Sequence, residues 1–131
     1  MVTSVLDASA VIAWLKDEPG AALVDLALEG VGRAVISTVN LAEVMSFAAQ
    51  AGQQTEEIMG LLRETGLAFL PLSTTQARRI GDLRPLTASA GLSLGDRACL
   101  ALGQELGAQV LTTDRVWADL ELSGLMVKLL R

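Results

Sequence analysis

The 131-residue chain contains no histidine, and this absence excludes several kinds of catalytic site. Ser-His-Asp and Cys-His activation of a nucleophile, imidazole zinc sites and two-histidine nuclease mechanisms all need an imidazole group. Any catalysis by this chain must therefore use carboxylates, lysine, hydroxyl groups or a hard metal ion.

Cysteine and aromatic residues are also scarce. Cys99 is the only cysteine, so it cannot pair within the chain or build a zinc or iron–sulfur site by itself. This composition fits a reducing compartment, and we expect a cytoplasmic protein. With no tyrosine, two phenylalanines and two tryptophans, the chain lacks a platform for stacking bases. We therefore expect Trp14 and Trp117 to pack in the core or an interface.

Positive charge is in deficit as well, because 10 Lys and Arg face 15 Asp and Glu, for a net charge of −5. A protein held on nucleic acid only by general electrostatic attraction would be basic. Hydrophobic residues make up 51% of the chain, which is enough for one core without disulfides or structural metals. Charged residues interrupt the most apolar segments, so we expect neither a signal peptide nor a membrane span.

Short apolar segments alternate with segments of helical spacing along the whole chain. We expect strands at residues 4–6, 34–36, 67–70, 109–112 and 126–129, and helices at 8–16, 19–29, 40–51, 55–65, 73–84, 93–107 and 115–120. Apolar strands separated by helices are typical of a mainly parallel sheet that is covered on both faces. The sequence predicts one α/β domain over residues 1–131, built as a three-layer α/β/α sandwich.

Acidic residues occur where the predicted strands end. Asp7 directly follows the first strand and Asp114 the fourth, while Glu43 and Asp96 lie in the first turns of helices. Each alone could serve helix capping, and Asn40 with Glu43 and Ser93 with Asp96 have capping-box spacing. A cluster of acids at one sheet edge, however, repels itself unless a cation is present.

Oxygen donors without His or Cys favour a hard divalent ion, Mg²⁺ or Mn²⁺, which also binds phosphate oxygens. The sequence therefore predicts a metal site at this sheet edge and a phosphate compound as the substrate.

Four segments carry these acids in a fixed order: Leu6–Ala10, Asn40–Val44, Gly91–Leu102 and Leu111–Trp117. Together they resemble the successive motifs of the PIN-domain family, specifically VapC-type toxins of type II toxin–antitoxin systems, over essentially the whole chain. The resemblance implies a Mg²⁺- or Mn²⁺-dependent endoribonuclease that is neutralised by a small cognate antitoxin and usually works as a homodimer.

The resemblance also implies the residues of the site. Its catalytic, metal-binding acids are Asp7, Glu43, Asp96 and Asp114. Ser9 and Thr113 match polar positions beside the metal in the family. Arg97 and Arg115, each next to a proposed ligand, are candidates for contacting RNA phosphates, although each could equally pair with a neighbouring carboxylate.

Two alternatives belong to other functional classes. A receiver-like or phosphatase-like domain would accept a phosphoryl group on one strand-end Asp, but it usually has a second acid near Asp7 and a lysine at another strand end. Ala8 and Ser9 follow Asp7, and Lys16 lies a full helix away. A catalytically inactive PIN-like interaction module is the other alternative, and the presence of all four acids argues against it.

Overall fold

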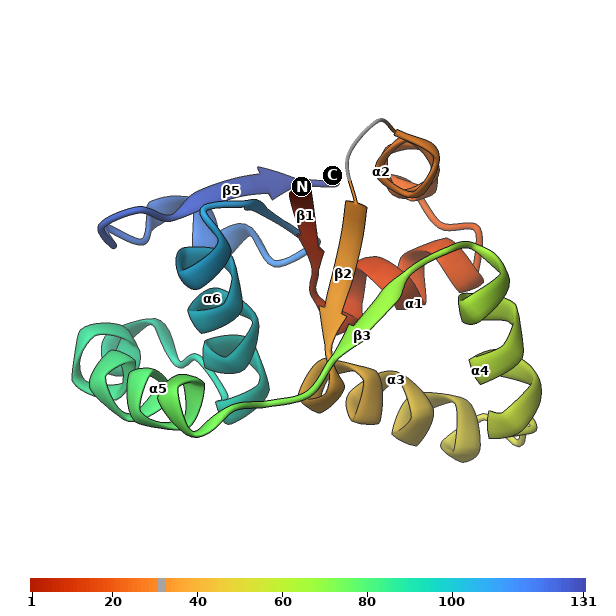
Figure 1. Cartoon of the computed structure of the whole chain (residues 1–131), viewed down its shortest axis with the longest axis horizontal. Helices are drawn as coiled ribbons and strands as arrows, with labels where there is room; N and C mark the ends of the chain where they lie inside the picture. Colours follow the sequence, from red (N-terminus) through yellow and green to blue (C-terminus); the bar gives the residue numbers. More distant parts are fainter. Residues whose placement is uncertain (31–32) are drawn as a thin grey trace.

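The fold is centred on a parallel sheet, which is seen in a computed structural model that describes residues 1–30 and 33–131 (Figure 1). Within these residues the sheet has five strands in the order β3-β2-β1-β4-β5, and every neighbouring pair is parallel. The strands are β1 (Val2–Leu6), β2 (Arg33–Ser37), β3 (Ala68–Leu70), β4 (Gln109–Thr112) and β5 (Met126–Leu129). The order places β1 in the middle, so residues that follow β1 lie at the centre of one sheet edge.

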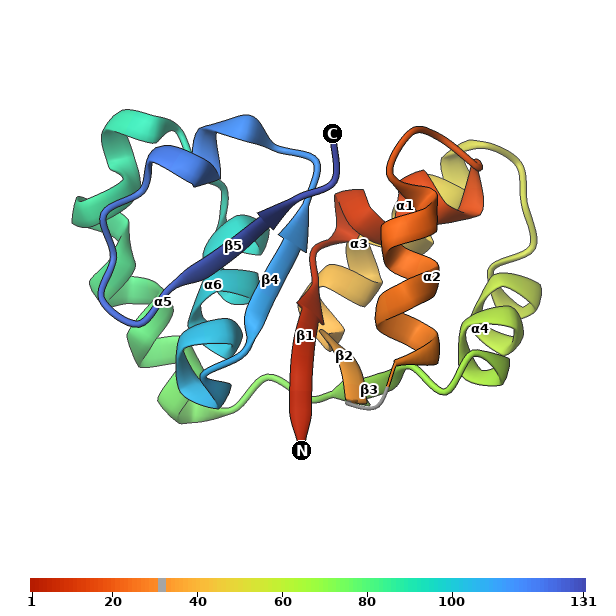
Figure 2. The same ribbon diagram turned by 90° about the horizontal axis from the view of Figure 1, so that it is seen from above.

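Helices cover both faces of this sheet, which confirms the predicted α/β/α sandwich (Figures 1 and 2). On one side lie α1 (Ala8–Leu15), α2 (Ala21–Glu29), α3 (Thr38–Gln50) and α4 (Thr55–Glu64). On the other side lie α5 (Thr74–Thr87) and α6 (Leu94–Leu106), with the short 3₁₀ helices η1 (Ala88–Ala90) and η2 (Arg115–Asp119). Within the described residues, no helix is long and apolar enough to cross a membrane.

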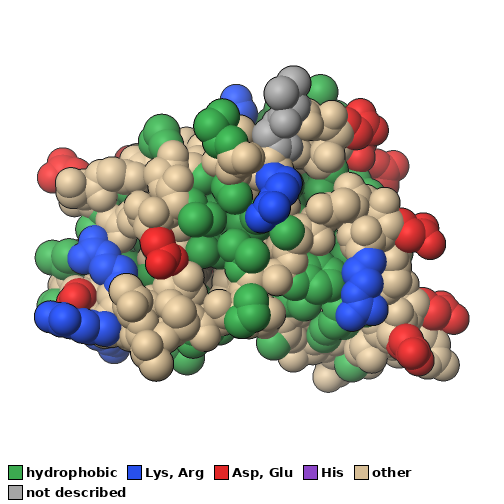
Figure 3. Space-filling view, in the orientation of Figure 1, with side chains coloured by type: hydrophobic (Ala, Val, Ile, Leu, Met, Phe, Trp, Pro, Cys, Tyr) green, Lys and Arg blue, Asp and Glu red, His purple; other side chains and the backbone are tan. Residues whose placement is uncertain are grey.

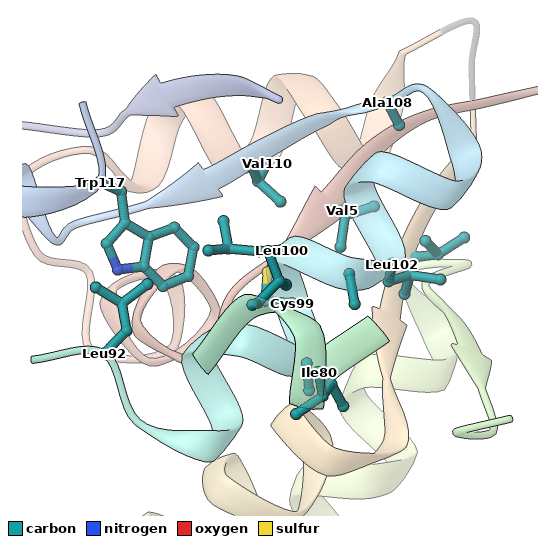
Figure 4. Packing of buried hydrophobic residues seen from close by; sticks show 13 residues of the cluster. Val5, Ile80, Leu92, Cys99, Leu100, Leu102, Ala108, Val110 and Trp117 are labelled. Atoms are coloured by element: carbon teal, nitrogen blue, oxygen red, sulfur yellow. The ribbon is translucent and has the colours of Figure 1, made fainter. Parts of the chain in front are cut away.

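Alternation along the strands divides the buried apolar residues into two clusters. Val5, Val35 and Val110 pack with α5 and α6, whereas Leu6, Ile36 and Leu111 pack with α1 to α4. Successive side chains of a strand point to opposite faces, so adjacent residues of one strand serve different clusters. Figure 4 shows the first cluster, and Trp117 lies at the same end of it as Leu92.

The predicted elements are all present, but several boundaries differ by one to three residues, among them the start of α2, which is Ala21 rather than Pro19, and boundaries of α5 and α3. Helix α5 continues to Thr87 with Pro85 inside it, although we expected Pro85 to end the helix near Arg84. A proline clashes with the carbonyl four residues earlier, and here that residue is Gly81, whose backbone adjusts most easily. Helix α3 begins at Thr38 rather than at Asn40, with Ser37 as its cap.

Candidate metal centre

Asp7 lies at the end of the central strand β1 and is only 4% exposed. The parallel pairing of Leu6 with Leu111 continues into a hydrogen bond from the Asp7 backbone N–H to the Leu111 carbonyl. Asp7 occupies the N-cap position of α1, yet its side chain makes no capping hydrogen bond. Its Oδ2 instead accepts hydrogen bonds from the hydroxyls of Ser9 (2.6 Å) and Thr112 (3.0 Å). The capping explanation therefore does not account for this carboxylate.

Burial and like charges make ionisation of Asp7 unfavourable. Desolvation by burial is the largest cause and raises the pKa of Asp7 from 3.8 to about 6. The hydrogen bonds from Ser9 and Thr112 oppose this rise, and the nearby charges of Asp96 and Glu43 add to it. Two further acids are thus close enough to act on this carboxyl group, as the sequence predicts.

Glu43 projects from the second turn of α3 and is held at the start of α6. Its Oε1 accepts a 2.9 Å hydrogen bond from Nδ2 of Asn40, and its carboxyl group lies against the backbone of Gly95. The expected capping box between Asn40 and Glu43 is absent because α3 begins two residues before Asn40. Asn40 therefore serves the Glu43 side chain rather than the helix end.

Asp96 and Asp114 both make capping contacts, in contrast to Asp7. The backbone N–H of Ser93 donates to Oδ2 of Asp96 (2.9 Å), which completes the capping box predicted for α6. The backbone N–H of Val116 donates to Oδ1 of Asp114 (3.0 Å) at the start of η2. Both carboxylates are half-buried. Each has one oxygen engaged in its cap, so capping and metal binding are compatible roles.

The four acids share one sheet edge without forming an assembled metal cluster. Among the residues that the structure describes, no three Asp, Glu or Cys side chains form a group that could hold a metal ion. The donors nevertheless fit Mg²⁺ or Mn²⁺, since a Mg²⁺ ion is commonly held by one or two carboxylates, several waters and substrate phosphates. A cation beside Asp7 would favour its charged form and so offset the rise in its pKa.

Polar support for Asp7 comes from Ser9 and from Thr112, of which the sequence analysis did not single out Thr112. Ser9 also accepts a 3.1 Å hydrogen bond from the backbone N–H of Thr113. The Thr112 hydroxyl contacts Asp7 and accepts from the backbone N–H of Asp114 (3.1 Å). The register of β1 and β4 sets Thr112 beside Asp7, and the role expected for Thr113 beside a metal stays a prediction. The sign of the supporting role of Thr112 in the sequence is its position two residues before Asp114.

The two candidate phosphate contacts have different surroundings. Nη1 of Arg97 donates to the Ile80 carbonyl of α5 (2.8 Å), so this guanidinium is engaged with a neighbouring helix. Arg115 is exposed beside Asp114. Phosphate contact by either residue stays a prediction, and Arg115 is the more exposed of the two.

The fold is similar to that of known proteins. The model of the PIN domain family matches residues 4–121, whereas comparison with curated proteins gives no match. One similar solved structure is DNA-bound VapBC from Salmonella typhimurium (TM-score 0.76, 18% identity, 100% of both chains). A second is VapBC2 from Rickettsia felis bound to a promoter DNA fragment (TM-score 0.75, 16% identity, 97% of this chain and 98% of that chain). A third is VapBC-5 from Mycobacterium tuberculosis (TM-score 0.66, 23% identity, 98% of this chain and 99% of that chain). At these identities the structures show a shared fold, and the family model spans most of the chain. This protein therefore belongs to the PIN-domain family.

Proposed function

We propose that this protein is a VapC-type toxin, a Mg²⁺- or Mn²⁺-dependent endoribonuclease that hydrolyses RNA through Asp7, Glu43, Asp96 and Asp114. PIN-domain toxins are generally nucleases, and the similar structures are toxin–antitoxin complexes. The observation that carries the proposal is Asp7, a buried carboxylate that caps no helix and lies close to two other acids. RNA as the substrate would place this activity in the cytoplasm.

The mechanism follows from the donors at the sheet edge. When bound here, Mg²⁺ or Mn²⁺ would lower the pKa of a bound water molecule, and the positive charge of the ion would stabilise the reacting phosphate. Asp7 would hold the ion from the centre of the sheet, with its orientation fixed by Ser9 and Thr112. Glu43, Asp96 and Asp114 would hold the ion or its waters from three other elements. Hydrolysis by water leaves a 5′-phosphate and a 3′-hydroxyl, and it needs no histidine.

We predict that the purified chain cleaves single-stranded or loop RNA with Mg²⁺ or Mn²⁺ and stops when EDTA is added. Cleavage is followed on gels, and the new ends are identified by their chemistry. Asp96→Asn is the matched control, because asparagine can still accept the Ser93 hydrogen bond while the charge is lost. In cells, 5′-phosphate ends mapped after brief expression of the parent should be missing with Asp96→Asn. Undiminished cleavage in EDTA, or 2′,3′-cyclic phosphate ends, would contradict the mechanism.

A small antitoxin is the proposed partner, and an apolar groove offers a place for it. The groove has a volume of about 420 Å³ and is lined by Leu15, Phe47, Ile58 and Leu61, with Lys16 at its side. Phe47 and Leu61 are 37% and 43% exposed. Apolar side chains at such a groove are typical anchors for a partner helix. We further propose a homodimer, as the resemblance implies, which light scattering would test.

We predict that purification from the native context yields a complex with a small protein that inhibits cleavage. Phe47→Glu should weaken this complex at least about 30-fold, since a buried aromatic anchor contributes about 2 kcal/mol or more to binding. Leu26→Glu is the control, because Leu26 is 65% exposed on α2 and does not line the groove. Recovery of only free, active protein would contradict the proposed partner, and equal affinities for both variants would exclude the groove.

Of the two alternative functions raised by the sequence, only the inactive PIN-like module still needs a test. Membership of the PIN-domain family leaves the receiver-like or phosphatase-like domain without support. An inactive PIN-like module differs from the proposed nuclease in one measurable property, because it would not bind Mg²⁺ or Mn²⁺. Titration calorimetry with either ion separates the two.

A further inference from the structure

Asn40 is a fully buried amide whose two donor hydrogens serve the acidic site. The side chain is 0% exposed, and Nδ2 donates to Oε1 of Glu43 and to the carbonyl of Gly95, each at 2.9 Å. Glu43 lies one turn further along α3, and Gly95 lies in the first turn of α6. One amide group therefore joins the Glu43 carboxylate to the helix that carries Asp96.

The orientation of this amide is set by its neighbours. Both contacts are oxygen acceptors, so a flipped Asn40 would direct its own oxygen at two other oxygens. In the observed orientation Oδ1 is buried and has no hydrogen-bond partner. An unpaired buried oxygen is unfavourable for stability. The residue is therefore better explained by its contact with Glu43 than by a contribution to the core.

Gly95 completes the surroundings of the Glu43 carboxylate. A Cβ atom built on Gly95 would collide with all three carboxyl atoms of Glu43. Gly95 lies within helix α6 and has no positive φ, so its backbone conformation does not require glycine. Alanine is the better helix former at such a position. The missing side chain thus makes room for the carboxylate.

We propose that Asn40 and Gly95 are positioning residues that hold the Glu43 carboxylate against the N-terminal turn of α6 and so set its place relative to Asp96. This inference rests on the proposed metal-dependent function. A glutamate side chain has several staggered rotamers, and the Asn40 hydrogen bond together with the Gly95 backbone selects one of them. Neither residue acts on the substrate, because both act through Glu43.

The first test replaces the amide and measures metal binding directly. Asn40→Leu removes both hydrogen bonds at similar volume. We expect it to raise the dissociation constant for Mn²⁺ at least about tenfold, the usual effect of losing a group that orients a metal ligand. Gln76→Leu is the matched control, because Gln76 is a buried amide that donates to a carboxylate, Oε2 of Glu105 (2.6 Å), away from the acidic site. This control should destabilise the fold and keep Mn²⁺ affinity within about twofold of the parent.

The second test leaves Asn40 intact and fills the space that Glu43 occupies. Gly95→Ala should fold, since alanine favours the helix, but it should displace the carboxylate and weaken Mn²⁺ binding at least about tenfold. Gly60→Ala in α4 is its control, because a Cβ there meets no atom within 4 Å. If Asn40→Leu does not fold, Gly95→Ala against Gly60→Ala decides the question.

The outcomes separate this inference from the proposed function. Calorimetry with MnCl₂ on the full chain is done first. If the parent binds no Mn²⁺, both the proposed metal-dependent function and this inference are wrong. If the parent binds Mn²⁺ and the Asn40→Leu and Gly95→Ala variants bind it within twofold of the parent, only the positioning role is overturned. Tenfold losses in the folded site variants, with both controls unchanged, support it.

Discussion

Replacing Asp7 with asparagine is expected to abolish RNA cleavage and to stabilise the metal-free chain at the same time. Burial and the charges of Asp96 and Glu43 raise the pKa of Asp7 from 3.8 to about 6. At neutral pH this rise corresponds to an upper limit of about 3 kcal/mol of unfavourable free energy for the charged form. Asparagine carries no charge, and its single oxygen can still accept from Ser9 and Thr112. We expect a gain of about 1–3 kcal/mol in the free energy of unfolding.

The same substitution should change how stability depends on pH. Because the folded-state pKa of Asp7 is raised, the folded chain binds this proton more tightly than the unfolded chain. The unfavourable contribution is fully present above about pH 6 and disappears as the pH falls through 6 toward 4. The metal-free parent should therefore gain stability from Asp7 on mild acidification, and Asp7→Asn should lack that gain. Denaturant titrations from pH 4.5 to 7.5 in EDTA measure the difference.

Loss of function should accompany this gain in stability. Losing a group that merely orients a metal ligand costs about 10–100-fold in affinity or activity, so loss of the ligand itself should cost more than about 100-fold. Added Mn²⁺ should raise the melting temperature of the parent by mass action and have little effect on Asp7→Asn. Asp82→Asn, which removes an exposed charge from α5, controls for net charge. A variant that melts lower in EDTA, responds normally to Mn²⁺ and still cleaves RNA would show that Asp7 is structural.

Truncation of Trp117 to alanine is expected to have the largest effect on stability. Trp117 is 0% exposed and belongs to the cluster between the sheet and helices α5 and α6, where its ring lies at one end (Figure 4). Removing a buried large aromatic side chain costs about 3–5 kcal/mol, because apolar burial is lost and a cavity remains. Trp117→Phe is the control, since it keeps a ring and removes an indole N–H that has no hydrogen-bond partner. We expect Trp117→Phe to cost less than half as much.

Denaturant unfolding monitored by circular dichroism measures both Trp117 variants. A base-stacking role for Trp117 makes the opposite prediction, namely weaker RNA binding with little loss of stability. If Trp117→Ala unfolds within about 1 kcal/mol of the parent, the core assignment is wrong. Full burial of the side chain favours the core, as the scarcity of aromatic residues in the sequence predicts.

Most surface charges differ in burial from the acids of the proposed site. On the face in Figure 3, hydrophobic side chains gather in the middle, and most Asp and Glu side chains lie toward one edge. The acids of the proposed site differ from such surface charges, because Asp7 is buried and Glu43, Asp96 and Asp114 are half-buried. Among the Asp and Glu residues that the structure describes, only Glu18 outside this set is also half-buried, and the others are exposed.

The sequence alone was sufficient for the layered fold and for the position of Asp7 at the end of β1. Strand alternation and helical spacing are local patterns, so each predicted element is present, and Ser93 with Asp96 forms the expected capping box. The position of an acid after a strand also fixes the sheet edge on which it lies, because parallel strands all end there. Asp7, at the end of β1, needed no tertiary information beyond that rule.

Tertiary structure decided the contacts between elements that are distant in the sequence. The register of β1 and β4 gives Asp7 a supporting hydroxyl from Thr112. Packing of α3 against α6 turns Asn40 from an expected cap into a partner of Glu43 and Gly95, and contact with α5 engages Arg97. Local patterns set which face of an element is buried, but the neighbour that each polar group meets depends on strand register and helix packing, which form only when the whole core assembles.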